Sequence, residues 1–162
     1  MREPPVHFVA AEAARPGADA LFARVCADIL RVLPGADVQH IGATSVPGLI
    51  TRGDLDVCVR VPAGDFGAAE REVALLYARN EGNDLTATYA AFLDAGTRPP
   101  LGVQLVAAGG PEDMFVRLRD LLRARPDLVA SLNGLKARHE GAEAGVYRSA
   151  KSAWIGRVLG GQ

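Results

Sequence analysis

The sequence has 162 residues, of which 49% are hydrophobic and 23% are charged, and its formal net charge is −1. This composition is typical of a globular protein, and the length favours a single domain over residues 1–162. The near-neutral charge argues against an extended nucleic-acid partner, and no apolar run approaches the roughly 18 residues of a membrane span. Since the N-terminus also lacks a secretory pattern, we expect a cytoplasmic protein with no membrane partner.

The first half of the chain alternates helical and strand patterns. The elements predicted there are a helix at 18–33, strands at 38–41 and 54–61, and a helix at 65–79. The first helix is expected to end at Pro34-Gly35, and the second has Asp65 in the N-cap position.

The second half begins with two strand patterns, at 86–93 and 101–106, and their short separation predicts a hairpin. After Gly109-Gly110-Pro111 the pattern is helical to the end, with breaks at Pro126 and near Gly141. Together these elements predict an α+β fold: a small mixed β-sheet with helices on one face and a C-terminal helical segment.

A pair of acids, Asp54 and Asp56, lies at the start of the strand predicted at 54–61. Asp54 and Asp56 have the i, i+2 spacing that places two side chains on the same face of a strand. Carboxylate oxygens are the ligands that Mg²⁺ and Mn²⁺ take in proteins, with water and substrate phosphates completing the shell. We therefore predict that this pair holds a divalent cation and is catalytic.

The segment just before the acids consists of small residues. Residues 40–49 read His-Ile-Gly-Ala-Thr-Ser-Val-Pro-Gly-Leu, which predicts a strand end, a turn and a short helix. Backbone N–H groups stay accessible beside small residues, and the N-terminus of a helix attracts anions. Gly42, Thr44 and Ser45 are therefore predicted to bind a phosphate next to the acid pair.

The turn and the acid pair together resemble the signature of DNA polymerase beta-like nucleotidyltransferases. More narrowly, residues 40–49 resemble the His-Ile-Gly-Ser-Thr-Ser-Val-Pro-Gly-Leu hallmark of the GrpB family, small bacterial proteins regarded as members of that superfamily. The resemblance continues at 118–123, 135–136 and 147–152, and little of it falls between 63 and 100. It implies a nucleotidyltransferase-like fold and a nucleoside triphosphate, or another phosphorylated small molecule, as the partner.

Two positions depart from the GrpB pattern. Asp54 stands in Arg-Gly-Asp-Leu-Asp where most GrpB-like sequences read Lys-Pro-Ile-Ile-Asp, so this chain has two acids where many relatives have one. Gln104 occupies the position where the family tends to have His and where active transferases carry a third carboxylate. An amide supplies neither the charge nor the base that two-metal catalysis needs. Asp84 or Asp94 could substitute if the fold brought one of them near.

The basic candidates lie in the C-terminal third. Lys136 and Lys151 are the two lysines of the chain and fall where the GrpB-like pattern has lysines. A compact ammonium is typical of phosphate sites, so both are candidates for phosphate contact, as is Arg119. The alternative is that the lysine stems pack beside core aromatics such as Tyr147. His40 either orients the phosphate turn or a metal-bound water, or is a hydrogen-bonded structural histidine, which we favour.

The sequence thus leaves two functions open. One is Mg²⁺-dependent transfer of a nucleotidyl group from a nucleoside triphosphate to a small acceptor. The other is a catalytically inactive protein of the same fold that binds a nucleotide or phosphometabolite, an interpretation that Gln104 favours.

Overall fold

The structure is a computed structural model and describes residues 2–161. Its main sheet is mixed, with strand order β2-β4-β7-β6-β5. The strands are β2 (Asp37–Ile41), β4 (Leu55–Val61), β5 (Ala78–Arg79), β6 (Tyr89–Asp94) and β7 (Leu101–Ala107). β4 and β7 run parallel, and the other neighbours are antiparallel. A separate two-stranded sheet pairs β1 (Val9–Ala10) with β3 (Ile50–Thr51).

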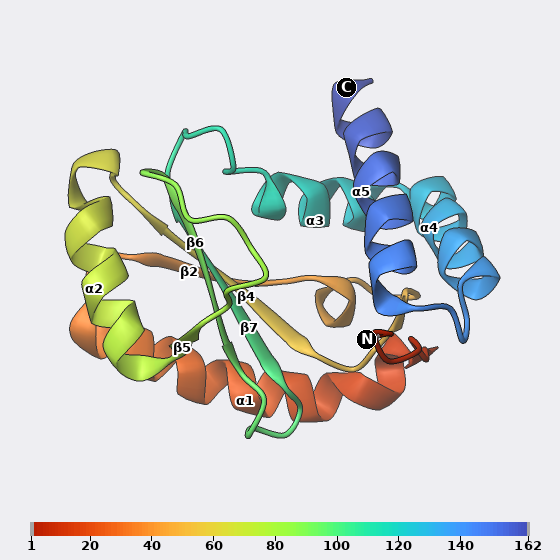
Figure 1. The fold of residues 1–162 in the computed structure, drawn as a ribbon, viewed down its shortest axis with the longest axis horizontal. Helices are drawn as coiled ribbons and strands as arrows, with labels where there is room; N and C mark the ends of the chain where they lie inside the picture. Colours follow the sequence, from red (N-terminus) through yellow and green to blue (C-terminus); the bar gives the residue numbers. More distant parts are fainter. Residues whose placement is uncertain (1, 162) are drawn as a thin grey trace.

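Helices pack on both faces of the main sheet (Figure 1). They are α1 (Ala11–Val32), α2 (Phe66–Leu76), α3 (Phe115–Ala124), α4 (Pro126–Arg138) and α5 (Ala144–Gly160). Short 3₁₀ turns, η1 (Ala43–Ser45) and η2 (Ala63–Asp65), follow β2 and β4. α1 and α2 cover one face, and the C-terminal helices lie on the other side (Figure 1). The fold is therefore α+β with a small mixed sheet, as the sequence predicts.

The side chains of β4 divide between the two faces. Leu55, Val57 and Val59 are fully buried and pack with α1 and α2 in the larger core. Burial of an aliphatic side chain of this size stabilises the fold by roughly 1.5–3 kcal/mol, so the register of β4 is strongly fixed. Asp56 and Cys58 alternate with them and must face the C-terminal helices. The hydrophobic pattern of the strand therefore determines which way the acid points.

Two predicted helices have different ends in the structure. α1 begins at Ala11 rather than at Ala18 and continues through Pro16-Gly17. Ala11 and Ala18 are both completely buried, so tertiary packing outweighs the breaking tendency of Pro-Gly. α2 ends at Leu76 rather than at Arg79, because the chain then joins the sheet edge as β5.

The hairpin prediction is confirmed, since β6 and β7 pair antiparallel. The break at Pro126 is confirmed too, with proline in the first turn of α4, where its missing N–H costs no helical hydrogen bond. Asp65 lies at the predicted N-cap of α2, but its side chain forms no capping hydrogen bond.

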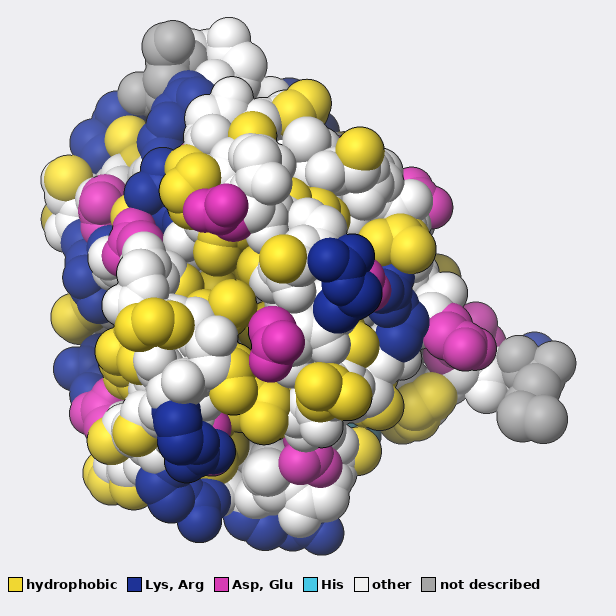
Figure 2. Space-filling view, turned by 90° about the vertical axis from the view of Figure 1, so that its left-hand side faces the viewer, with side chains coloured by type: hydrophobic (Ala, Val, Ile, Leu, Met, Phe, Trp, Pro, Cys, Tyr) yellow, Lys and Arg dark blue, Asp and Glu magenta, His cyan; other side chains and the backbone are white. Residues whose placement is uncertain are grey.

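The side of the molecule next to α2 carries acidic, basic and hydrophobic side chains interspersed with one another (Figure 2). Among residues 2–161, no helix combines the length and the apolar character needed to cross a bilayer.

Candidate functional site

The carboxylate of Asp56 lies between two glycines, one just after β2 and one within β7. Gly42, which follows β2, has φ of +74°, and a Cβ there would come 2.4 Å from Asp56 Oδ2. Gly102 pairs with Asp56 across the β4–β7 ladder, and a Cβ there would come 3.0 Å from Asp56 Oδ1. Both the left-handed backbone at Gly42 and the close approach of the carboxylate therefore require glycine at this edge of the site.

Asp54 and Asp56 line one cleft of about 470 Å³ together with Lys136 and Lys151, and we call it the acid–lysine cleft. Its wall also includes Arg52 and Tyr147. Neither carboxylate has a hydrogen-bond or ion-pair partner within residues 2–161. The acids and lysines that the sequence singles out thus share one cleft, although they come from segments about half the chain apart.

Burial perturbs two ionisable groups of the cleft. Loss of hydration raises the pKa of Asp56 to about 6, with the nearby charges of Lys151 and Lys136 opposing the rise and that of Asp54 adding to it. Burial likewise lowers the pKa of Lys136 to about 7, helped by the positive charge of Lys151. At neutral pH Asp56 is therefore mostly ionised, while Lys136 titrates near pH 7.

Lys136 is a core residue as well as a cleft residue. Its side chain is only 2% exposed, and Nζ donates a hydrogen bond to the Ile50 carbonyl at 2.5 Å. Nζ also lies 5.9 Å from the centre of the Phe8 ring, within the range of a cation–π contact. Of the two lysines, Lys151 is the one with no hydrogen-bond or ion-pair partner among the described residues.

Gln104 lies in a smaller cavity of about 170 Å³ that Asp56 also lines. Its pairing partner on β4 is Cys58, and its side-chain oxygen accepts a hydrogen bond from the Tyr89 hydroxyl at 2.6 Å. The position directly beside Asp56 is instead taken by Gly102. A third acid could not stand at that position without displacing the Asp56 carboxylate.

Neither Asp84 nor Asp94 supplies a third acid. Asp94 accepts a hydrogen bond from the Gly96 N–H within its own turn, and neither residue lines the acid–lysine cleft. Over the described part of the chain, no group of three or more His, Cys, Asp or Glu side chains is placed to hold a metal. A third carboxylate of the cleft, that of Glu3, is paired with Arg148, so Asp54 and Asp56 are the two unpaired acids of the cleft among residues 2–161.

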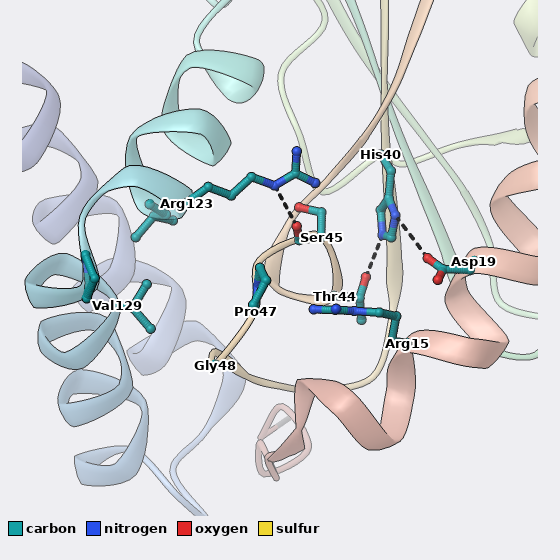
Figure 3. A pocket seen from close by; sticks show the side chains of 11 residues that line it. Arg15, Asp19, His40, Thr44, Ser45, Pro47, Gly48, Arg123 and Val129 are labelled. Carbon is teal, nitrogen blue, oxygen red and sulfur yellow. Dashed lines mark hydrogen bonds and ion pairs between the residues drawn. The ribbon is translucent and has the colours of Figure 1, made fainter.

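The hydroxyl groups of the turn donate to backbone carbonyls, and their residues do not line the acid–lysine cleft. Figure 3 shows Thr44 and Ser45 beside His40 and Arg123 instead. Ser45 Oγ donates to the Gly42 carbonyl at 2.6 Å, and Thr44 Oγ1 donates to the Asp54 carbonyl at 3.4 Å. Both residues are buried and line a different cavity on the opposite side of the turn. Of the three residues predicted to bind phosphate beside the acids, only Gly42 lies against Asp56.

His40 belongs to this opposite side of the turn. Its Nε2 is 2.9 Å from Thr44 Oγ1, its Nδ1 is 3.7 Å from Asp19 Oδ1, and its ring stacks on Phe22 (Figure 3). Burial lowers its pKa below the ordinary value, so the ring is neutral at pH 7. These contacts match the structural interpretation of His40.

Arg119 has its guanidinium directed at the end of β2. Its Nη1 donates to Gln39 Oε1 at 2.8 Å and to the His40 carbonyl at 3.0 Å. The residue also lines the smaller cavity beside Asp56. Arg119 therefore lies near the predicted site with most of its donors already used.

The sequence analysis missed three residues near the site: Gly102, Arg15 and Arg123. Gly102 could have been found, because glycine inside a strand often marks a close approach of another group. Arg15 and Arg123, which line the cavity on the opposite side of the turn, come from helices whose relative placement depends on the whole fold.

Comparison with known proteins agrees with this architecture. The family model described as GrpB protein matches residues 9–160. A UPF0157 protein of Vibrio cholerae is 32% identical over 155 residues, which cover 96% of this chain and 82% of that protein. A UPF0157 protein of Pseudomonas aeruginosa is 29% identical over 143 residues, covering 79% of this chain and 56% of that protein.

Solved structures show the same fold. The crystal structure of GrpB from Enterococcus faecalis has a TM-score of 0.62 and 18% identity, covering 89% of this chain and 88% of that one. The Cid1 poly(U) polymerase, solved with Mg and 3′-dATP bound, has a TM-score of 0.54 and 11% identity. That likeness covers 79% of this chain and 41% of the polymerase and is one of fold alone. The chain belongs to the GrpB family, and its fold resembles that of nucleotidyltransferases.

Proposed function

We propose that the protein binds a nucleoside triphosphate together with a divalent cation, Mg²⁺ or Mn²⁺, in the acid–lysine cleft. The observation that carries this proposal is the convergence of two unpartnered carboxylates, Asp54 and Asp56, with Lys136 and Lys151 in one cleft. Acids without internal partners are free to ligate a cation, and a cation bound there needs further oxygen ligands that phosphates supply. The lysines would offset the remaining negative charge of the phosphates.

The donor set fits a hard cation. Asp54, just before β4, and Asp56, the second residue of β4, provide carboxylate oxygens at i, i+2 spacing. The pKa of Asp56, about 6, leaves it ionised at neutral pH. A bound Mg²⁺ polarises phosphoryl oxygens and orients the triphosphate. Lys151, with its side chain otherwise unpaired among residues 2–161, is placed to neutralise phosphate charge.

Nucleotidyl transfer to a small acceptor is the reaction that such a site supports best. In this reaction the acceptor hydroxyl attacks the α-phosphorus, the bond to the bridging oxygen breaks, and pyrophosphate leaves. The proton of the hydroxyl needs a base, and we assign this role to Asp56, whose pKa is raised by burial in the metal-free protein. The fold resemblance to Cid1, whose solved structure contains Mg and 3′-dATP, supports the same substrate class.

Gln104 favours a second candidate, a non-catalytic binder of nucleotides. It lies in the cavity beside Asp56 and accepts a hydrogen bond from Tyr89, so a neutral amide occupies the region where an additional acid would help hold a second metal. A site with two carboxylates still holds one cation. It lacks the charge expected of two-metal catalysis.

Calorimetric titration with Mn²⁺ and a non-hydrolysable nucleoside triphosphate tests the shared binding proposal. Asp54→Asn and Asp56→Asn should each weaken binding about 10- to 100-fold, because each removes one charged ligand contact. Asp65→Asn is a matched control, since Asp65 is exposed, forms no cap and lies outside the cleft. Wild-type affinity in the Asp54→Asn, Asp56→Asn double variant would place the cation elsewhere.

Pyrophosphate release separates the two candidates. Gln104→Glu keeps an oxygen for the Tyr89 hydrogen bond and adds a charge to the cavity. If the wild type is a binder that lacks charge, the variant should bind Mn²⁺ more tightly and gain slow pyrophosphate release. If the wild type is already a transferase, the same change places a negative charge beside the phosphates and should reduce its turnover. The assay covers a panel of triphosphates and small hydroxyl acceptors.

A further inference from the structure

A second cavity, of about 690 Å³, lies on the opposite side of the 42–48 turn from the acid–lysine cleft. Helix α1 forms one wall, and the segment around the α3–α4 junction forms the other (Figure 3). Its charged lining residues are Arg15, Asp19 and Arg123, and its apolar ones are Pro47, Leu122, Pro126 and Val129. We call it the arginine cavity. The proposed nucleotide site uses none of these residues.

Arg15 lacks an acceptor in this cavity. Its Nη2 is buried and has no hydrogen-bond partner in the part of the chain that the structure describes. Figure 3 shows the side chain reaching from α1 beneath Thr44 toward the turn. A buried guanidinium N–H without an acceptor costs free energy, and an unsatisfied group of this kind calls for an explanation such as a ligand.

Arg123 approaches the same turn from α3. Its Nε donates to the Ser45 carbonyl at 2.9 Å, and its two Nη groups have no acceptor within residues 2–161. Burial and the positive charges of Arg119 and Arg15 lower the pKa of Arg123, while the negative charge of Asp120 opposes them. The two arginines of the cavity repel each other, and neither forms an ion pair within residues 2–161.

The cavity contains little negative charge to balance the arginines. Asp19 is its one acidic lining residue, and its side chain is 58% exposed and directed at His40 Nδ1. Since burial keeps His40 neutral at pH 7, the histidine neither adds to nor offsets the positive charge. Two guanidinium groups thus face a cavity in which their electrostatic partner is missing.

We propose that the arginine cavity binds a phosphate monoester, with the phosphate between Arg15 and Arg123 and the organic group against the apolar wall. A phosphate dianion accepts hydrogen bonds from two guanidinium groups at once, and arginine forms bidentate pairs with it. The volume lies within the roughly 300–1,000 Å³ that small-molecule sites occupy.

Phenyl phosphate, titrated calorimetrically at constant ionic strength, is the probe. Arg15→Gln and Arg123→Gln should each weaken its binding at least about tenfold. Arg24→Gln removes the same charge from an exposed position on α1 outside the cavity and should leave the affinity unchanged. Lys151→Ala should also leave it unchanged, and loss of binding in that variant would assign the phosphate to the acid–lysine cleft and overturn the proposal.

Thermal unfolding gives a second measurement, in which Arg15→Gln should be more stable than the wild type although it binds phenyl phosphate more weakly. Arg15→Gln should raise the melting temperature in anion-free buffer, since it removes an unpaired buried group and one repulsion. Phenyl phosphate should raise the melting temperature of the wild type and not that of Arg15→Gln. A lower melting temperature for the variant without anion, or an equal increase for both proteins, would contradict the site.

Two further measurements use the wild-type protein, so they test the site even if Arg123→Gln fails to fold. In the wild type, phenyl phosphate should shift the amide resonances of Thr44, Ser45, Val46 and Gly48 more than those of 54–56, and the reverse would overturn the site. Benzoate should bind at least about tenfold more weakly than phenyl phosphate, because a carboxylate carries one charge rather than two. Equal affinity would overturn the assignment of a phosphate monoester.

Discussion

The two sides of the 42–48 turn differ in how their charges are arranged. In the acid–lysine cleft three carboxylates, those of Glu3, Asp54 and Asp56, share the space with two lysines and two arginines, so both signs of charge are present. In the arginine cavity Arg15 and Arg123 face one exposed acid, Asp19, and positive charge is in excess. A ligand for the cleft must therefore bring both signs, as a cation with a triphosphate does. A ligand for the cavity needs only negative charge.

The difference also shows how one short segment can serve two sites. Gly42 leaves room for Asp56 on one side, while Thr44 and Ser45 direct their hydroxyls to the other. Gly42 itself has a positive φ and immediately precedes the 3₁₀ turn that holds Thr44 and Ser45. Single substitutions on either side of the turn can show whether the two sides behave as separate electrostatic units.

The largest effect should come from the buried charge of Lys136. An unfolded lysine keeps its proton up to a pKa near 10.5, while folded Lys136 loses it near 7. Between these pH values the unfolded chain binds more protons than the folded chain, so the free energy of unfolding should rise with pH through this window. The gain should be on the order of several kcal/mol, since each pKa unit corresponds to about 1.4 kcal/mol.

Lys136→Met is the matched variant for this measurement. It keeps a long flexible side chain and removes the titrating group. Denaturant unfolding at pH 6 should show the variant to be more stable than the wild type, and the two should converge by about pH 10.5. Parallel pH profiles for the two proteins would mean that Lys136 is not the group that titrates.

Gly42→Ala should have the next largest effect. A non-glycine residue in the left-handed region costs of order 1–3 kcal/mol, and the new Cβ would meet Asp56 Oδ2 at 2.4 Å. Together these should destabilise the fold by about 3 kcal/mol and displace the Asp56 carboxylate, which we propose as a cation ligand.

Gly53→Ala separates these two causes. Gly53 also has a positive φ, of +98°, but a Cβ there would meet nothing within 4 Å. This control should lose only the backbone contribution and keep its Mn²⁺ affinity. Equal losses of stability and of Mn²⁺ affinity in the two variants would show that the contact with Asp56 contributes nothing.

A third prediction compares the two lysines of the cleft. Lys151→Ala should weaken binding of a metal-bound triphosphate by about 1.5–3 kcal/mol, which is the usual contribution of a charged hydrogen bond. Lys136→Met should weaken it less, because the Lys136 ammonium already donates to the Ile50 carbonyl and is only 2% exposed. Calorimetry on both variants shows which one loses more triphosphate affinity. A larger loss for Lys136→Met would mean that Lys136, not Lys151, is the main phosphate contact.

Much of the fold follows from the sequence, because its strongest patterns are local. The alternation in β4 and the proline at the start of α4 both depend on nearby residues, and the structure has them where predicted. The start of α1 does not, since burial of Ala11 against the rest of the protein extends the helix past Pro16. Where tertiary packing is strong, a helix can continue through residues such as Pro and Gly that would otherwise break it.

Part of the candidate site was predictable because local sequence patterns carry it. The acids are close in sequence and share a strand edge, and resemblance to a family pattern singled out Lys136 and Lys151. The direction of the Thr44 and Ser45 hydroxyls was not predictable, because it depends on which backbone carbonyls the turn leaves open. The arginine cavity depends on how α1 and α3 approach one turn, which a single sequence does not encode locally.

The smallest effect is expected from Thr44→Val, which tests the link between the two sides. Thr44 has one hydroxyl proton and gives it to the Asp54 carbonyl, so we assign the shared proton of the other hydrogen bond to His40 Nε2. Valine has nearly the same shape and leaves both partners unpaired, which should cost about 1 kcal/mol of stability.

Its effect on binding should differ between the two sides. Asp54 loses a hydrogen bond that holds its backbone, so affinity for a metal-bound triphosphate should fall about two- to fivefold, equivalent to a fraction of a neutral hydrogen bond. Phenyl phosphate affinity should stay within about twofold of wild type, because His40 is neutral and contributes no charge to the arginine cavity. Denaturant unfolding and the two titrations measure these quantities on one variant. Equal losses of both affinities would show that Thr44 couples the cleft and the cavity, and that they are not separate electrostatic units.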